Sequence, residues 1–299
     1  MSQARSDGGA GGARKAGGWR RFLPPPWRNP APVVGVLRFS GVIGAVTPLR
    51  QGLTLTASAA AIEKAFSLRC LEAVAIIINS PGGSPVQSTL IHDRIRAHAA
   101  ERKVPVVAFC EDVAASGGYL LALAGDQIFA DASSIVGSIG VVSAGFGFDQ
   151  AIARLGIDRR VHTSGTRKMI LDPFQPEKAE DVEKLRSLQA EIHENFKALV
   201  RARRGAAIEG REEELFSGEF WTGTRAFELG LIDGIGDIRQ VMRARFGDRV
   251  KLTPVATARG WLQRLRPGVA RQSGTEGATL AGQAISAIEE RALWQRYGL

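Results

Sequence analysis

The sequence predicts an α/β fold built around a parallel β-sheet. Short apolar runs rich in β-branched residues alternate with segments of helical periodicity, which is typical of strands joined by right-handed helical crossovers. Two of the predicted strands end in glycine-rich turns, at the edge of an open sheet where ligand sites form. The chain has 299 residues, 44% of them hydrophobic, and is long enough for one large domain or two small ones.

The first half of the predicted domain alternates strands and helices. Each strand is a β-branched or apolar run, and each helix places apolar residues at steps of three and four. We predict strands over 33–39, 74–78, 106–109 and 127–130, with helices over 56–66, 86–103 and from 117 to about 124. The helix over 86–103 is expected to bury one face made of Leu90, Ile91, Ile95 and Ala99.

The second half of the chain is predicted to be mainly helical. Its strongest signal is the segment 176–204, which begins at a proline, repeats apolar residues at helical spacing and ends before Gly205. Further along the chain we expect two helices within 211–246 around the glycine-rich turn 230–236, and a final amphipathic helix that includes residues 285–293. A short strand is expected over 159–162.

Composition divides the chain into three parts. We predict a disordered basic extension over 1–31, a folded domain over 32–246, and a basic C-terminal extension with a terminal helix over 247–299. The net charge of +9 is concentrated toward the two ends, because the central body is slightly acidic. This distribution suits an anionic membrane surface or an acidic partner at least as well as DNA, and we predict no nucleic-acid partner.

Cysteine usage and hydropathy indicate the cellular compartment in which we expect the protein to work. The two cysteines, Cys70 and Cys110, lack a short metal-type spacing, which favours a reducing compartment over a disulfide scaffold. The polar, glycine-rich start lacks the apolar core of a secretory signal, and no stretch approaches the roughly 18 apolar residues that cross a bilayer. We therefore expect a cytoplasmic protein that can also lie against the inner face of the membrane.

The turn Ser116-Gly117-Gly118 predicts a nucleophile. It follows a buried strand and opens a helix, so the Ser116 hydroxyl would be exposed with the helix N-terminus behind it. The N–H of Gly117 can point at a developing oxyanion, and Gly83, in the turn after the preceding strand, can supply a second donor. The alternative for this tripeptide is a simple helix cap.

A serine nucleophile needs a base, and the sequence offers two kinds. The histidines are His92, His98, His162 and His193. None of them lies in a loop with a carboxylate suited to orient it, although His162 is the best placed. Lys168 is the other candidate, because a buried lysine can be neutral near pH 7 and Ser-Lys pairs replace the triad in some hydrolases. Taken alone, Lys168 fits an ordinary surface lysine better than a general base.

Five motifs together resemble those of the signal peptide peptidase A (SppA) type serine peptidases, in order and in spacing. The likeness covers roughly residues 32–246, and Lys168 follows Ser116 by the 52 residues that the family's Ser-Lys dyad leads one to expect. The motifs are Asn79–Gly83, Ala115–Tyr119, Gly137–Val141, Ser164-Gly165 with Lys168 and Pro173-Phe174, and Trp221–Gly223 with Leu229–Asp233.

The resemblance implies a fold related to the Clp-protease and crotonase folds, with ring-shaped homo-oligomers. It implies a peptidase that works through an acyl-enzyme and degrades signal peptides or other small or unfolded peptides, without a cofactor or a metal. Ser116 would be the nucleophile, Lys168 the general base, and Gly83 and Gly117 the oxyanion donors. Ser138 corresponds to a serine expected near the lysine amine; it would orient that amine, or it caps a turn.

Some questions stay open at this point. Family members usually carry an N-terminal transmembrane anchor, and this sequence shows none, which bears on whether membrane-held signal peptides are substrates. Ser116 and Lys168 lie in separate loops, so the dyad can be completed within one subunit or between neighbours. A crotonase-like acyl-CoA enzyme and a non-enzymatic membrane-associated scaffold are the competing interpretations.

Overall fold

The computed structural model describes residues 30–44, 52–165, 167–256 and 291–298. Residues 1–29 of the predicted basic N-terminal extension, residues 257–284 of the predicted C-terminal extension and the start of the predicted last helix, 285–290, lie outside the described residues. Among the described residues, no helix combines the length and apolar character needed to cross a bilayer.

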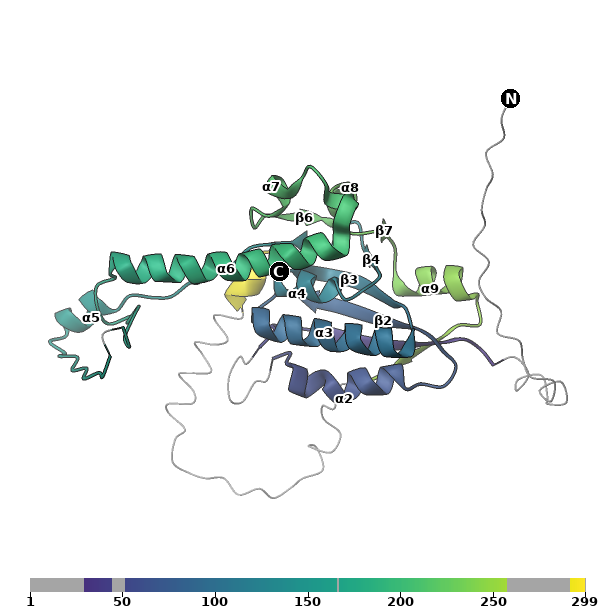
Figure 1. Ribbon diagram of the computed structural model, residues 1–299, viewed down its shortest axis with the longest axis horizontal. Coiled ribbons are helices and arrows are strands. Elements are labelled where there is room, and N and C mark those ends of the chain that lie inside the picture. The colour runs from purple at the N-terminus through teal and green to yellow at the C-terminus, as the bar shows by residue number, and fades with distance from the viewer. Residues whose placement is uncertain (1–29, 45–51, 166, 257–290, 299) are drawn as a thin grey trace, which may run out of the picture.

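Within the described residues, the strands form one mostly parallel sheet of eight strands, which confirms the predicted α/β class (Figure 1). Its main path runs β6-β5-β3-β2-β1-β8, with β4 pairing β3 and β7. The pair β5–β6 is antiparallel, and the other pairs described are parallel. The strands are β1 (Val33–Ser40), β2 (Leu71–Ser80), β3 (Val106–Ala115), β4 (Gln127–Ala130), β5 (Ile135–Gly137), β6 (Phe220–Thr222), β7 (Gly234–Ile235) and β8 (Lys251–Pro254).

Helices cover both faces of this sheet, which explains why its central strands are continuous apolar runs. The helices are α2 (Leu55–Phe66), α3 (Pro85–Arg102), α4 (Gly117–Ala122), α5 (Asp149–Arg154), α6 (Ala179–Arg204), the 3₁₀ turn η2 (Gly205–Ile208), α7 (Glu212–Leu215), α8 (Gly223–Glu228) and α9 (Ile238–Phe246). On one face, α2, α3, α4 and the end of α6 pack on alternate residues of β1, such as Leu37 and Phe39. On the other, Met242 of α9 packs on Val34 and Val36.

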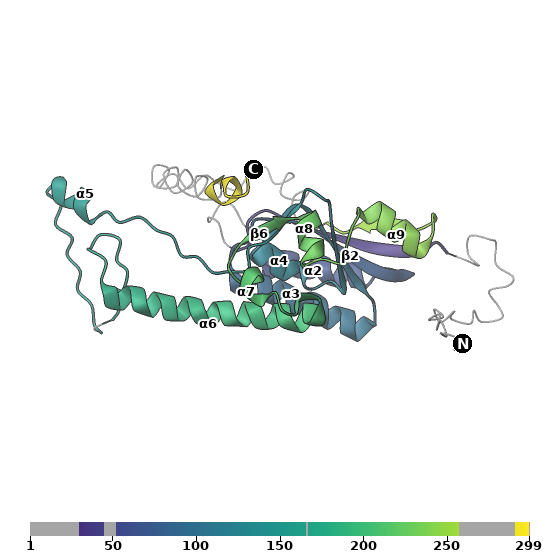
Figure 2. The same ribbon diagram turned by 90° about the horizontal axis from the view of Figure 1, so that it is seen from above.

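The long helix α6 leaves the body of the molecule. Its C-terminal half contributes Phe196 and Val200 to the main core, whereas its N-terminal half projects beyond the sheet and carries α5 at its far end (Figures 1 and 2). We call α5, the N-terminal half of α6 and the chain over 141–178 the arm.

Three predictions about local structure need correction. Residues 159–162 form no strand; they lie in the arm, beyond the sheet they would have to join. Leu90 does not belong to the buried face of α3, since it is 41% exposed while Ile91 and Ile95 are fully buried. Strand β8 lies past the predicted domain boundary at 246 and pairs with the edge strand β1.

His92 on α3 makes the stability of the fold sensitive to acid. Its side chain is buried, and burial lowers the pKa of His92 below its ordinary value of 6.5, against the raising effect of the Asp93 carboxylate. The folded protein therefore keeps His92 neutral at a pH where the unfolded chain binds a proton. As pH falls below 6.5, the free energy of unfolding should drop by at most about 1.4 kcal/mol per pH unit from this group.

Urea unfolding at pH 7, 6 and 5 measures this effect. His92→Leu should lose less stability than the unmodified protein between pH 7 and 5, because the buried titratable group is gone. His162→Gln is the matched control, since His162 is exposed in the arm, and it should follow the unmodified protein. Parallel pH profiles for the unmodified and His92→Leu proteins would show that His92 does not carry the dependence.

Candidate active site

Ser116 lies where β3 passes into α4. Its φ of 52° and ψ of −120° form a conformation that is costly for a residue with a Cβ. Hydrogen bonds hold the backbone there: Ser116 N donates to Gly137 O over 2.8 Å, and Ser116 O accepts from Leu120 N over 3.0 Å. A strained strand-to-helix turn of this kind presents a hydroxyl at the carboxyl edge of a sheet, as a serine nucleophile requires.

The glycine turn after β2 packs directly against Ser116. A Cβ on Gly82 would lie 2.8 Å from Ser116 Cβ, and a Cβ on Gly83 would lie 2.1 Å from Ile43 O. Both glycines have positive φ, 104° and 139°, so no side chain fits at either position. Ile43 holds the turn in place, because its N–H donates to Gly82 O and its carbonyl accepts from Ser84 N, each over 2.8 Å.

Two peptide N–H groups at this junction are available to a ligand. Among the hydrogen bonds of the described residues, neither Gly83 N nor Gly117 N is a donor. The two groups are adjacent, since Gly83 N lies 3.4 Å from the place a Gly117 Cβ would take. The 18-residue helix α3 begins at the same turn, and the partial positive charge of its N-terminus favours an anion there. This pair of donors can stabilise the oxyanion of an acyl-transfer reaction.

Ser138 is next in sequence to a residue that binds the backbone of the nucleophile turn. It follows Gly137, whose carbonyl binds Ser116 N, and it is buried with a φ of 54°. Its backbone N–H donates to Glu219 O over 2.7 Å, which ties it to the turn before β6. Within the described residues, the hydroxyl groups of Ser116 and Ser138 make no hydrogen bond, so neither is committed to another group of this chain.

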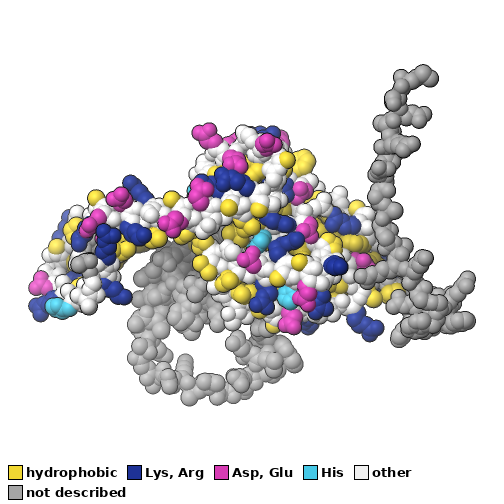
Figure 3. All heavy atoms as spheres, in the orientation of Figure 1, with side chains coloured by type: hydrophobic (Ala, Val, Ile, Leu, Met, Phe, Trp, Pro, Cys, Tyr) yellow, Lys and Arg dark blue, Asp and Glu magenta, His cyan; other side chains and the backbone are white. Residues whose placement is uncertain are grey.

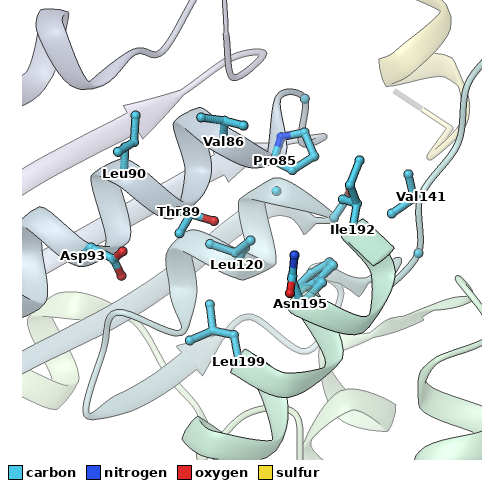
Figure 4. Close-up of a pocket in the computed structure, with 15 residues that line it drawn as sticks. Pro85, Val86, Thr89, Leu90, Asp93, Leu120, Val141, Ile192, Asn195 and Leu199 are labelled. Carbon is cyan, nitrogen blue, oxygen red and sulfur yellow. The ribbon is translucent and has the colours of Figure 1, made fainter. Parts of the chain in front are cut away.

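A groove leads away from Ser116 between α3 and α6, with α4 as its floor (Figure 4). It has a volume of about 370 Å³, and its lining includes Gly83, Ser116 and Gly117 of the nucleophile turn together with Gly140 and Val141. Its walls are mostly apolar and consist of Val86, Leu90, Leu120, Ile192, Phe196 and Leu199, while Thr89, Asp93 and Asn195 add polar atoms. The wall residues recur at steps of three and four on α3 and on α6, so two helical faces oppose each other across the groove.

The histidines are engaged away from Ser116. His92 Nδ1 lies 2.8 Å from Asp93 Oδ1, and His193 Nε2 lies 3.0 Å from Ile139 O. His98 stacks on Phe66, and His162 is exposed in the arm. The structure therefore places no histidine of the described residues in hydrogen-bond contact with Ser116, and a Ser-His pair within one chain has no geometric support.

Lys168 lies in the arm, in the segment that joins α5 to α6. This segment sits at the far end of α6 from the body (Figures 1 and 2), and Lys168 is exposed. The arm tip is itself ordered by packing: Arg159 pairs with Asp172 over 2.9 Å and lies over the ring of Phe174, which also contacts Phe148. The structure thus brings Ser116, Gly83, Gly117 and Ser138 together but does not bring Lys168 of the same chain to them.

Two other ionisable groups near the turn are structural. Tyr119 donates its hydroxyl hydrogen to Leu231 O over 2.8 Å, and burial raises the pKa of Tyr119. Burial likewise raises the pKa of the Cys110 thiol to about 12, so that group stays protonated at neutral pH. Among the described residues, no cluster of three or more His, Cys, Asp or Glu side chains is placed to hold a metal ion.

Comparison with known proteins now identifies the family. The family model described as Peptidase family S49 matches residues 98–251, which include Ser116, Ser138 and Lys168. This chain belongs to peptidase family S49. The resemblance to SppA and the predicted membership of a serine peptidase family are thereby confirmed, and the mostly parallel α/β sheet agrees with the Clp-protease and crotonase type of fold expected for S49 peptidases.

Several known proteins are similar to this chain beyond the residues that the S49 family model matches. Proteins named Na(+)/H(+) antiporter NhaA in Brucella abortus and Brucella melitensis are each 51% identical over 286 residues, which are 94% of this chain and 39% of those proteins. The chloroplastic serine protease SPPA of Arabidopsis thaliana is 33% identical over 70% of this chain and 31% of its own length. A putative protease of Synechocystis sp. is 32% identical, over 66% of this chain and 72% of its own. The chain therefore spans less than half the length of the Brucella and Arabidopsis relatives.

Sequence reasoning missed the groove. Its signal was present on α3, where Val86, Leu90 and Asp93 share one helical face, and Val86 and Leu90 stay 66% and 41% exposed. Helical spacing alone groups Leu90 with Ile91, Ile95 and Ala99 on one face, and so predicts that Leu90 is buried. The opposing face of α6 could be paired with it only once the fold was known.

Proposed function

We propose that this chain is a serine endopeptidase that hydrolyses peptide bonds through an acyl-enzyme on Ser116. The observation that supports it best is the strained turn at Ser116, which faces two free backbone donors at the mouth of an apolar groove. The direct test is whether the Ser116→Ala protein loses the turnover of a fluorogenic peptide.

The proposed reaction uses the groups in a fixed order. The amine of Lys168 takes the proton from Ser116 Oγ as the oxygen attacks the peptide carbonyl, and the N–H groups of Gly83 and Gly117 stabilise the resulting oxyanion. The protonated lysine then gives its proton to the leaving amine, which departs and leaves an ester on Ser116. Water, deprotonated by the same amine, attacks the ester and regenerates the serine. We propose that the hydroxyl of Ser138 orients the amine of Lys168.

Lys168 would come from a second copy of the chain. Within one chain it lies on the arm, while a general base must be within about 3 Å of the proton it takes. A projecting arm with an ordered tip suits delivery of such a residue to a neighbour. The shape of the chain supports delivery of Lys168 to a neighbour, because the half of α6 that projects from the core is available for an interface.

The surface of the arm favours this assembly. Hydrophobic side chains lie along the lower edge of α6 and continue onto the body beneath it (Figure 3). The arm exposes large apolar side chains that a solitary chain would leave in water: Val142, Phe146, Leu155, Ile157 and Leu188. We propose that copies of the chain bury this surface against one another in a closed ring.

The substrates we propose are signal peptides or other small or unfolded peptides. The groove beside Ser116 has a volume of about 370 Å³, which accommodates a substrate side chain but not a folded domain. The wall residues are mainly aliphatic, which suits the apolar parts of substrate side chains.

We propose that the protein works in the cytoplasm, in peripheral contact with the membrane. Helix α9 and strand β8 expose basic residues, among them Arg239, Arg243 and Lys251. The match of nearly the whole chain to part of proteins named as antiporters is consistent with work near a membrane.

Sedimentation with anionic vesicles tests this contact. Each basic residue near an anionic surface contributes about 1 kcal/mol, so binding at low salt should weaken about tenfold or more in a protein carrying Arg239→Gln and Arg243→Gln. The matched control carries Lys184→Gln and Arg186→Gln on the arm. Absence of binding at low salt, or binding that persists at high salt, would contradict an electrostatic contact.

A further inference from the structure

The groove beside Ser116 ends on a carboxylate. Gly83 and Gly117, the proposed oxyanion donors, line the same groove. Asp93 lies on α3 eight residues after Pro85, at the opposite end of the labelled lining residues from Val141 (Figure 4). At 1.5 Å per residue, this separation corresponds to about 12 Å along the helix. A side chain must therefore be long to reach Asp93 from the carbonyl that Ser116 attacks.

Asp93 is not neutralised by a cation among the described residues. Its Oδ1 lies 2.8 Å from His92 Nδ1, and His92 is buried, which lowers its pKa and keeps the imidazole neutral at pH 7. The nearby arginines are committed elsewhere: Arg96 pairs with Asp126 over 2.6 Å, and Arg203 donates to Leu123 O and Gly125 O, each over 2.8 Å. The side chain of Asp93 is 65% exposed and carries its charge at one end of the groove.

We propose that the groove holds the side chain of the residue whose carbonyl Ser116 attacks, and that Asp93 selects lysine or arginine at that position. This assignment rests on the proposed peptidase function. The side chain in question is the one attached next to the attacked carbonyl, and the donors for that carbonyl oxygen line the same groove as Asp93.

The lining of the groove is complementary to both the stem and the tip of a lysine or arginine side chain. Lysine and arginine have an apolar stem, which the aliphatic walls Val86, Leu90 and Leu120 can bury, and a cationic tip, which Asp93 can bind. Asn195 and Thr89 offer further polar atoms for the donors at the tip. A leucine would leave the far end of the groove unfilled, and a glutamate would bring a second negative charge to Asp93.

Three fluorogenic peptides that differ only in the residue before the scissile bond test the assignment. They carry lysine, norleucine, which has a similar stem without the amine, or glutamate. We expect kcat/KM for lysine to exceed that for norleucine by about tenfold, the contribution of one charge-assisted hydrogen bond. Asp93→Asn should reduce this ratio about tenfold while keeping an oxygen to accept from His92, and Asp93→Lys should favour the glutamate peptide.

Glu101→Gln is the matched control for these variants. Glu101 is on the same helix, its Oε2 lies 3.8 Å from His98 Nδ1, and its side chain is 67% exposed, but it does not line the groove. It should leave the lysine-to-norleucine ratio unchanged. A ratio near one in the unmodified protein, or an equal fall in the Glu101→Gln and Asp93→Asn proteins, would overturn the assignment.

A binding measurement separates this assignment from the peptidase proposal. In the Ser116→Ala protein, fluorescence anisotropy should show tighter binding of the lysine peptide than of the norleucine peptide, and Asp93→Asn should remove the difference. Preferential binding without hydrolysis in the unmodified protein would reject the peptidase proposal and keep the groove assignment. Hydrolysis of all three peptides at similar rates, with similar binding, would do the reverse.

Discussion

Replacing Ser116 with alanine should abolish peptide hydrolysis. The proposed acyl-enzyme forms on the Ser116 oxygen, and the remaining donors cannot replace a nucleophile, so kcat should fall by about 10⁴-fold or more. The fold should be retained, because alanine keeps the Cβ and the backbone hydrogen bonds to Gly137 O and from Leu120 N. Turnover of a fluorogenic peptide, with circular dichroism as the check on folding, measures both.

Ser133→Ala is the matched control, since Ser133 is an exposed serine outside the groove. A fluorophosphonate probe gives a second readout, because it should label the unmodified protein on Ser116 and leave the Ser116→Ala protein unlabelled. A crotonase-like acyl-CoA enzyme or a scaffold would need neither the hydroxyl nor the label. Full hydrolysis by the Ser116→Ala protein would therefore reject the proposed mechanism.

Mixing two inactive proteins should restore activity if neighbours share the dyad. Lys168→Ala should by itself lose about 10⁴-fold in kcat, since the serine then lacks its base. In rings assembled from Ser116→Ala and Lys168→Ala chains, some interfaces pair an intact Ser116 with an intact Lys168. We expect a substantial fraction of activity to return as subunits exchange, followed by peptide turnover over time.

The mixture needs an independent measure of exchange. Fluorescence energy transfer between differently labelled chains provides it, and Lys178→Ala, an exposed lysine at the start of α6, is the control that should stay active alone. A mixture that exchanges subunits and remains inactive would place the dyad within one chain. That result would require the arm to fold back onto its own body.

The sheet could be predicted because its central strands are recognisable without their neighbours. Residues 33–37 of β1, 73–78 of β2 and 106–110 of β3 are largely buried on both faces, so each run is apolar. The turn after β2 carries Gly82 and Gly83, which have positive φ, and the turn after β3 begins at Ser116, whose φ is also positive. The same turns hold Ser116 and Gly83, which is why these candidates could be placed at one sheet edge from the sequence.

Other features depend on contacts that no local pattern reports. The short strands β5, β6 and β8 span three or four residues each and exist through pairing with distant partners, for example Ile135 with Thr222. The strand expected over 159–162 failed for the opposite reason, because its residues lie in an arm that no strand of the sheet reaches. The separation of Lys168 from Ser116 is a property of the arm's direction, which spacing along the chain does not encode.

If neighbouring subunits share the dyad as proposed, the projecting arm keeps the enzyme inactive until chains assemble. A newly synthesised chain would carry a formed nucleophile turn without its base, so it would be harmless to other unfolded chains around it until it met further copies. Such a protein would need no inhibitory propeptide, because dilution alone would keep it silent. Activity per chain would then rise with the concentration of the protein, and the cell could set the rate of proteolysis through the amount it makes.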